Sequence, residues 1–177
     1  MSEPTSRRGV RLGVDVGAVR VGLAVSDVHG MLATPVETLR RDVATDSDQD
    51  RIVREVVERE ALEVVVGLPR SLSGAEGAAA ATARAYAVGL AGRLRAAGLD
   101  TPVRLVDERL STVEAHRSLR ASGVAGRKQR SVVDQVAAVL VLQQALDTER
   151  TSGAAAGEAV EPVSSTGGGG TAADPTA

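Results

Sequence analysis

The chain has 177 residues, a length that favours one domain with a single sizeable core. It contains no cysteine, so disulfides and thiolate metal sites are excluded, and a metal would be bound through oxygen or through His29 and His116. The formal net charge of −2 neither requires nor excludes a nucleic-acid partner. Tyr86 is the only aromatic residue, which argues against a single-strand binder that stacks bases on exposed rings.

The two ends of the chain differ in composition from its middle. Residues 1–9 carry charges without an apolar segment and are expected to form a flexible N-terminus. Residues 148–177 are rich in Gly, Ala and Ser and are expected to be a disordered tail, because they cannot bury enough apolar surface. No stretch approaches the roughly 18 apolar residues of a spanning helix, so a cytoplasmic protein without a membrane partner is expected.

The domain that remains, residues 10–147, begins with three predicted strands. Residues 10–16 and 19–26 are rich in valine and flank a Gly17-Ala18 turn, a pattern typical of a β-hairpin. Residues 31–38 extend the hairpin, and Pro35 favours an edge position or an irregular start for this strand. The sequence therefore predicts a three-stranded meander.

Helices and buried strands alternate after the meander. Asp46 or Ser47 is expected to cap a helix, and Leu62 to Val66 is short and apolar enough for a strand buried on both faces. The remaining predictions are a helix over 78–97, a strand over 103–106, a helix over 112–121, a loop over 122–130 and a final helix over 131–146 with Val132, Val136, Val139, Leu140 and Gln143 along one side. This order indicates an α/β fold with a mixed five-stranded sheet and helices on both faces.

Three carboxylates are candidates for one metal site. Asp15 lies inside an apolar strand, where a carboxylate needs a metal or an arginine, and either partner would serve. Glu108 follows a buried strand at the carboxyl end, where sites in α/β sheets gather. Asp134 lies near a helix start, where it could merely complement the helix dipole. Jointly they suit Mg²⁺ or Mn²⁺, which prefer oxygen ligands, and phosphodiester chemistry.

Other polar residues fit this site less well. Asp107 and Glu108 are consecutive and point to opposite faces if extended, so only one faces Asp15. Asp27 is expected to be structural, because it lies roughly 16 Å along the hairpin from Asp15. His29 and His116 have no spacing that pairs them. Four basic residues could bind phosphates beside the carboxylates, or form a solvated basic loop: Arg109, Arg127, Lys128 and Arg130.

Several motifs follow one another along the chain: Gly13-Val-Asp15-Val-Gly17 continuing through Arg20-Val-Gly22 to Ser26-Asp27, then Val66-Gly-Leu-Pro69, then Asp107-Glu-Arg-Leu-Ser-Thr112, and finally Asp134-Gln-Val-Ala-Ala138. Together they resemble the motifs of the YqgF family of Holliday junction resolvases and pre-16S rRNA nucleases. The resemblance runs in order over roughly residues 10–146. It implies an RNase H-like fold, and the acidic metal positions of the family correspond to Asp15, Glu108 and Asp134.

The resemblance also implies a function. A metal-dependent endonuclease that processes the 5′ end of pre-16S rRNA during ribosome biogenesis is expected, leaving a 5′-phosphate and a free 3′-hydroxyl. A Holliday junction resolvase acting on branched DNA is the alternative, and cleavage of two junction strands would favour a homodimer. Precursor rRNA as substrate would make ribosomal particles partners.

Two other classes of protein share parts of the pattern. An actin-like or sugar kinase has a similar Asp-x-Gly turn, but it needs two related domains, and the chain carries no phosphate-binding glycine loop. A non-catalytic module that keeps the fold to bind RNA remains open, because a fold alone does not establish activity.

Overall fold

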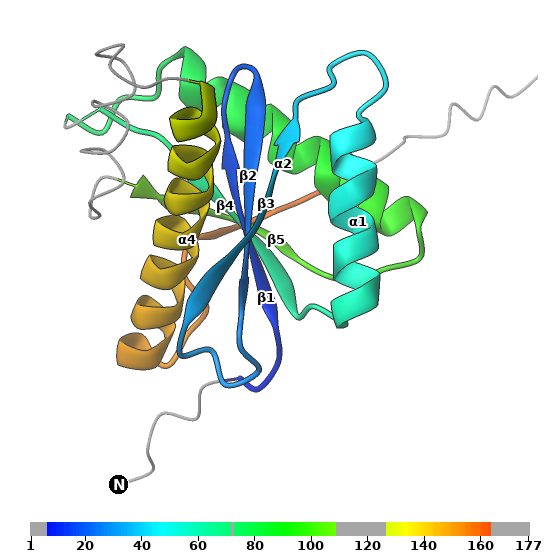
Figure 1. Ribbon diagram of the computed structural model, residues 1–177. Coiled ribbons are helices and arrows are strands. Elements are labelled where there is room, and N and C mark those ends of the chain that lie inside the picture. The colour runs from blue at the N-terminus through cyan, green and yellow to red at the C-terminus, as the bar shows by residue number, and fades with distance from the viewer. Residues whose placement is uncertain (1–6, 72, 109–126, 164–177) are drawn as a thin grey trace, which may run out of the picture.

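A computed structural model describes residues 7–71, 73–108 and 127–163, and for residues 127–134 it describes the backbone alone. A six-stranded mixed sheet with the order β3-β2-β1-β4-β5-β6 forms the centre. Figure 1 shows α4 on one side of this sheet and α1 and α2 on the other. The predicted α/β class with helices on both faces is confirmed.

The meander forms as expected. β1 (Arg11–Val16) and β2 (Arg20–Ser26) pair antiparallel, and the amide of Gly17 donates to the carbonyl of Arg20 across the turn. β3 (Ala33–Arg40) is the edge strand, and its register with β2 shifts beside Pro35. Proline has no amide hydrogen to donate to a ladder, so the edge position and the irregularity are both explained.

Two buried strands extend the sheet in parallel on the other side of β1. β4 (Glu63–Leu68) pairs with β1 and with β5 (Val103–Asp107). Parallel neighbours need crossover connections, and α1 (Ser47–Arg59) and α2 (Ala78–Ala96) supply them. Asp46 precedes α1 as expected but makes no side-chain cap, and the side chain of Asp42 instead accepts hydrogen bonds from Ala44, Thr45 and Ser47.

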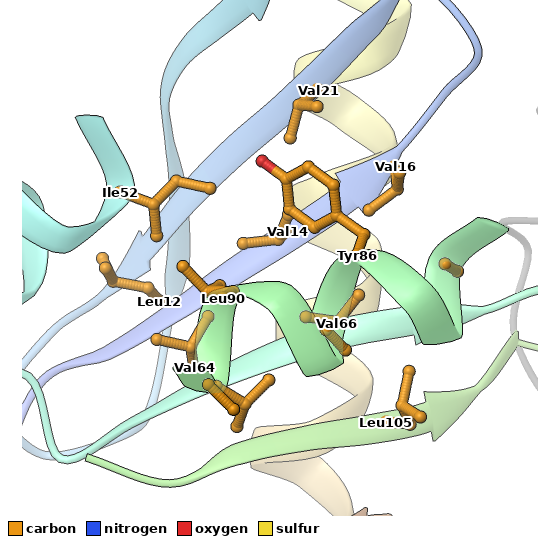
Figure 2. Close-up of a cluster of buried hydrophobic side chains, with 14 of the residues drawn as sticks. Leu12, Val14, Val16, Val21, Ile52, Val64, Val66, Tyr86, Leu90 and Leu105 are labelled. Atoms are coloured by element: carbon orange, nitrogen blue, oxygen red, sulfur yellow. The ribbon is translucent and has the colours of Figure 1, made fainter. Parts of the chain in front are cut away.

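One face of the sheet packs against α1 and α2 around an aliphatic core. Figure 2 shows Tyr86 and Leu90 of α2 and Ile52 of α1 lying over the valines and leucines of the strands. Alternate residues of β1 point into this core, namely Leu12, Val14 and Val16. The residues between them therefore face the opposite side.

The opposite face is covered by α4 (Arg127–Ser152). A Cβ on Gly13 would lie 2.6 Å from Cβ of Leu142, so the glycine lets this helix approach the sheet closely. The predicted apolar side of the helix is only partly right. Val139 and Leu140 pack against the core, but Val136 is exposed, and the buried apolar residues among the described side chains of the helix are Ala137, Ala138, Val141, Leu142, Ala145 and Leu146. The small alanines fit the close approach that Gly13 permits. A prediction from hydrophobicity alone instead placed Val136 on the buried side.

The end of the domain also differs from the expectation. α4 continues to Ser152, and β6 (Glu158–Val160) adds a sixth strand antiparallel to β5. The prediction of a tail without structure is therefore wrong for residues 148–160, and the sheet has six strands instead of five. The side chain of Glu149 accepts hydrogen bonds from Arg7 and Arg11, which ties the helix end to the N-terminal segment. Residues 164–177 and the helix predicted over 112–121 lie outside the described residues.

Candidate active site

Asp15 lies on β1 with 1% of its surface exposed. Because Val14 and Val16 point into the core under α1 and α2, Asp15 faces the side of the sheet that α4 covers, as does Gly13. Its strand partner on β2 is Gly22. The carboxylate is thus held on a rigid central strand, near the end at which β1 turns into β2.

Glu108 follows β5 and is 3% exposed. Its position over the neighbouring strand depends on Gly67 of β4, because a Cβ on Gly67 would lie only 2.1 Å from Oε1 of Glu108. The same Cβ would lie 2.9 Å from Cγ2 of Val141 on α4, so this carboxylate is on the α4 side of the sheet. Asp107, one residue earlier, instead has its carboxylate 3.9 Å from the guanidinium of Arg70.

The strand register brings Asp15 and Glu108 towards each other. Val14 pairs with Val66, so the next position on β1, Asp15, adjoins Gly67. Neighbouring strands are about 4.8 Å apart, and the Glu108 carboxylate extends back over Gly67 into that space. Gly67 is a site residue that the sequence reasoning missed, although it stands in the Val66-Gly-Leu-Pro69 motif that carried the resemblance.

The backbone of α4 carries position 134 past the same end of the sheet. Glu149 bonds Arg11, and Ala138 and Leu142 lie over Gly13, so α4 runs antiparallel to β1. Position 134 is one helical turn before Ala138, on the same face of the helix, and Asp15 is two residues beyond Gly13. The side chain of Asp134 lies outside the description. Within the described side chains, no group of three or more His, Asp or Glu residues is arranged to hold a metal ion.

The predicted basic residues are only partly described. Arg127, Lys128 and Arg130 belong to the first turns of α4, so the expectation that they lie in a loop before the helix is wrong. Helix propensity in this arginine-rich stretch extends the helix four residues earlier than the apolar pattern indicates. Arg109 and His116 lie outside the described residues.

Asp27 is structural, as expected. Its carboxylate accepts hydrogen bonds from the amides of His29, Met31 and Leu32 and so closes the turn between β2 and β3. These bonds, led by the one from Leu32, stabilise the charged form and lower the pKa of Asp27. Asp27 follows the far end of β2, whereas Asp15 pairs with Gly22 in the middle of that strand.

A brace behind the turn at Gly17 was not foreseen from the sequence. Nη1 of Arg41 donates to the carbonyl of Gly17 at 3.1 Å, and its guanidinium lies 5.6 Å from the centre of the Tyr86 ring. The hydroxyl of Tyr86 donates to Oδ2 of buried Asp48 at 2.8 Å. Burial and this carboxylate raise the pKa of Tyr86, so the hydroxyl stays protonated and the brace stays connected.

The family model of RuvX, Holliday junction resolvase, matches residues 9–148. The chain belongs to the RuvX family. Two relatives carry the name "Putative pre-16S rRNA nuclease": one of Nocardioides sp. is 57% identical and aligns with 88% of this chain and 98% of its own length, and one of Streptomyces coelicolor is 55% identical over 90% and 93%. The expected family is confirmed. The expected activity, that of a nuclease that hydrolyses phosphodiester bonds, is confirmed as well.

A solved structure supports the fold. T. thermophilus RuvC in complex with Holliday junction substrate aligns with 83% of this RuvX chain and 98% of its own, with a TM-score of 0.50 and 18% identity. The RNase H-like fold is thereby confirmed. Nucleases of this fold and family generally depend on a divalent metal and act on nucleic acid. No helix among the described residues has the length and apolar character needed to cross a membrane.

Proposed function

We propose that this RuvX-family nuclease uses Asp15, Glu108 and Asp134 to cleave the 5′ end of pre-16S rRNA during ribosome biogenesis. The supporting observation is the pair of buried carboxylates, Asp15 on β1 and Glu108 after β5, on one face of the sheet, with Gly67 of the intervening strand β4 leaving room between them. The names of the two relatives support precursor rRNA as the substrate.

The donor set suits a hard divalent cation. Mg²⁺ and Mn²⁺ prefer carboxylate oxygen, and the space that Gly67 leaves beside Glu108 is one that a side chain would fill. Asp15, Glu108 and Asp134 would hold the cation. When bound, the cation would supply Lewis acidity to activate water and stabilise the leaving oxygen, and the products would carry a 5′-phosphate and a 3′-hydroxyl.

Four basic residues would position the substrate at these carboxylates. Arg109, Arg127, Lys128 and Arg130 would bind backbone phosphates, since three of them begin the helix that also carries Asp134. Asp15 belongs to the buried central strand β1, which fixes the position of its carboxylate. The Arg41–Tyr86 brace holds the turn that follows β1. Ribosomal particles would then be partners, and the cytoplasm, where they assemble, the location.

The test compares wild-type protein with Asp15→Asn on a labelled precursor rRNA segment and on a four-way DNA junction. We expect Mg²⁺- or Mn²⁺-dependent cutting of the rRNA, a loss of roughly a thousandfold or more in the variant, and no cutting with chelator. Asp27→Asn is the matched control, since it neutralises a carboxylate that closes a turn away from the site. It should retain wild-type activity.

The outcomes separate the alternatives. Cutting that survives both Asp15→Asn and chelator would disprove the metal-site assignment. Preferential cutting of the junction would favour a resolvase, the activity named in the description of the family, and sedimentation would then report whether the protein is a homodimer. Binding of either nucleic acid without cutting under any metal condition would favour a non-catalytic module.

A further inference from the structure

Two arginines lie directly opposite each other on β2 and β3. Arg20 pairs with Arg40, next to the pair Val21 and Leu39, whose side chains pack into the core under α1 and α2. Because side chains alternate along strands, Arg20 and Arg40 face the other side of the sheet, the side of Asp15. The side that holds the candidate active-site carboxylates therefore also carries two adjacent positive charges.

Like charges directly opposite each other on a sheet are unfavourable unless counter-charges lie close to both. Arg20 takes part in an interaction within the chain. Arg40 is exposed, and within the described part of the chain its side chain forms neither an ion pair nor a hydrogen bond. By contrast, carboxylates pair with many other described arginines, among them Arg51, Arg59, Arg70, Arg84 and Arg93. The position of Arg40 thus fits an anion supplied from outside the chain.

The placement fits a nucleic-acid backbone that runs across the candidate site. β3 is two strands from β1, about 10 Å, and Arg40 is two residues, roughly 7 Å, nearer the hairpin turn than the partner of Gly22. The backbones of Arg40 and Asp15 are therefore about 12 Å apart, a distance of a few nucleotides at most along one strand. Guanidinium groups bind phosphate oxygens bidentately.

We propose that Arg20 and Arg40 form a phosphate-binding pair that holds the nucleic-acid backbone on the β3 side of Asp15, a few nucleotides from the cleaved bond. This proposal rests on the proposed nuclease site. It gives the substrate a path: Glu108 lies on the β5 side of Asp15, and the arginine pair lies on the β3 side. The contact reads the backbone and not the bases, so it applies equally to RNA and DNA.

The test measures binding in an Asp15→Asn background, so that bound substrate stays intact. Arg40→Ala should weaken binding of the precursor rRNA segment roughly tenfold at 0.1 M salt and lower the slope of log affinity against log salt by about one. The four-way junction should lose affinity to a similar extent. Arg40→Lys should keep the salt slope but recover only part of the affinity, because lysine cannot bind bidentately.

Arg95→Ala is the matched control. Arg95 is an exposed arginine in the last turn of α2, which leads back to the start of β5 at the opposite end of the sheet. It should leave affinity and salt slope within about twofold of the parent. In the active protein, Arg40→Ala should raise KM with little change in kcat, because it removes binding and not chemistry.

Two results would overturn the proposal, and they differ in reach. If Arg40→Ala binds like Arg95→Ala while the wild-type protein cuts nucleic acid, the arginine pair is not a phosphate site and the proposed function stands. If the wild-type protein neither binds nor cuts either nucleic acid, both fail. Equal thermal melting of Arg40→Ala and wild type excludes unfolding as the cause of weaker binding.

Discussion

Gly67 shows how one residue without a side chain shapes the candidate site. It sits on β4 between Asp15 on β1 and Glu108 at the end of β5. Any larger residue would occupy the space of the Glu108 carboxylate, since even a Cβ would lie 2.1 Å from Oε1. The conformation of this glycine is ordinary for a strand, so space and not backbone freedom requires it.

Gly67→Ala is expected to displace Glu108 and lower kcat roughly a hundredfold, because misplacing a catalytic group by about 1 Å costs on that order. Overpacking should also lower the free energy of unfolding by about 2 kcal/mol. Steady-state cleavage of the precursor rRNA and chemical denaturation measure the two effects. Gly92→Ala is the control, since nothing lies within 4 Å of the added Cβ on that helix. Wild-type kcat in Gly67→Ala would show that the position of Glu108 is not needed.

At the scale of elements, α4 is fastened to the sheet at several points. Gln143 accepts a hydrogen bond from the amide of Ala33 at the start of β3, and Gln144 donates to the carbonyl of Asp107 at the end of β5. The last turns of α4 are held by Glu149, which bonds Arg7 and fully buried Arg11. These contacts fix the direction of α4 across the sheet, and so place position 134 near the end of the sheet at which β1 turns into β2.

Glu149 makes the fold sensitive to acid. Burial alone would raise the pKa of Glu149, but the hydrogen bonds and charges of Arg7 and Arg11 outweigh it and hold the pKa below its usual value. A lowered folded-state pKa stabilises the protein above about pH 4.5, and this stabilisation is lost as pH falls through the folded-state value.

Glu149→Gln should lower the free energy of unfolding at pH 7 by about 3 kcal/mol, because it leaves a buried arginine without its closest carboxylate. It should also flatten the fall in stability between about pH 5 and pH 3. Denaturation curves across this pH range measure both effects. Glu161→Gln, an exposed residue beyond β6, should change stability by less than about 0.5 kcal/mol. If the stability of Glu149→Gln fell as steeply as that of the wild type when the pH is lowered, this result would contradict the role of the ion pair.

For the whole molecule, the domain extends beyond the boundary at residue 147 that composition indicates. β6 pairs with β5 and covers an edge of the sheet, and Ala156 is buried beside α4. A covered edge also removes a row of unpaired backbone groups that could pair with another chain. The segment after residue 147 therefore belongs to the folded domain as far as β6.

Truncation tests this boundary directly. A chain that ends at Asp147 loses both Glu149 and β6, so its free energy of unfolding should fall by more than about 3 kcal/mol, with a greater tendency to aggregate. A chain that ends at Val163 keeps both and should melt within about 2 °C of the full-length protein. Thermal denaturation and light scattering provide the measurements. Equal stability of both truncations would place the boundary at residue 147 after all.

The sequence by itself determined the hairpin, the edge strand with Pro35, the buried parallel strands and the family. These features follow from local patterns: valine-rich runs, the missing proline amide and motifs of fixed spacing. It also indicated that Asp107 and Glu108 face opposite sides, because alternation along a strand is a local rule. The roles of Asp15, Glu108, Asp134 and the four basic residues in the site stay predictions.

Only the tertiary structure decided which face α4 buries, where the domain ends and what surrounds the carboxylates. The buried face of α4 depends on the close approach that Gly13 allows, and β6 is a strand because β5 offers it a partner. Likewise, Gly67 acquires its role, and Arg20 its like-charged neighbour Arg40, from strands far away in the sequence. Local propensity carries no information about such neighbours, because packing and strand register are properties of the whole sheet.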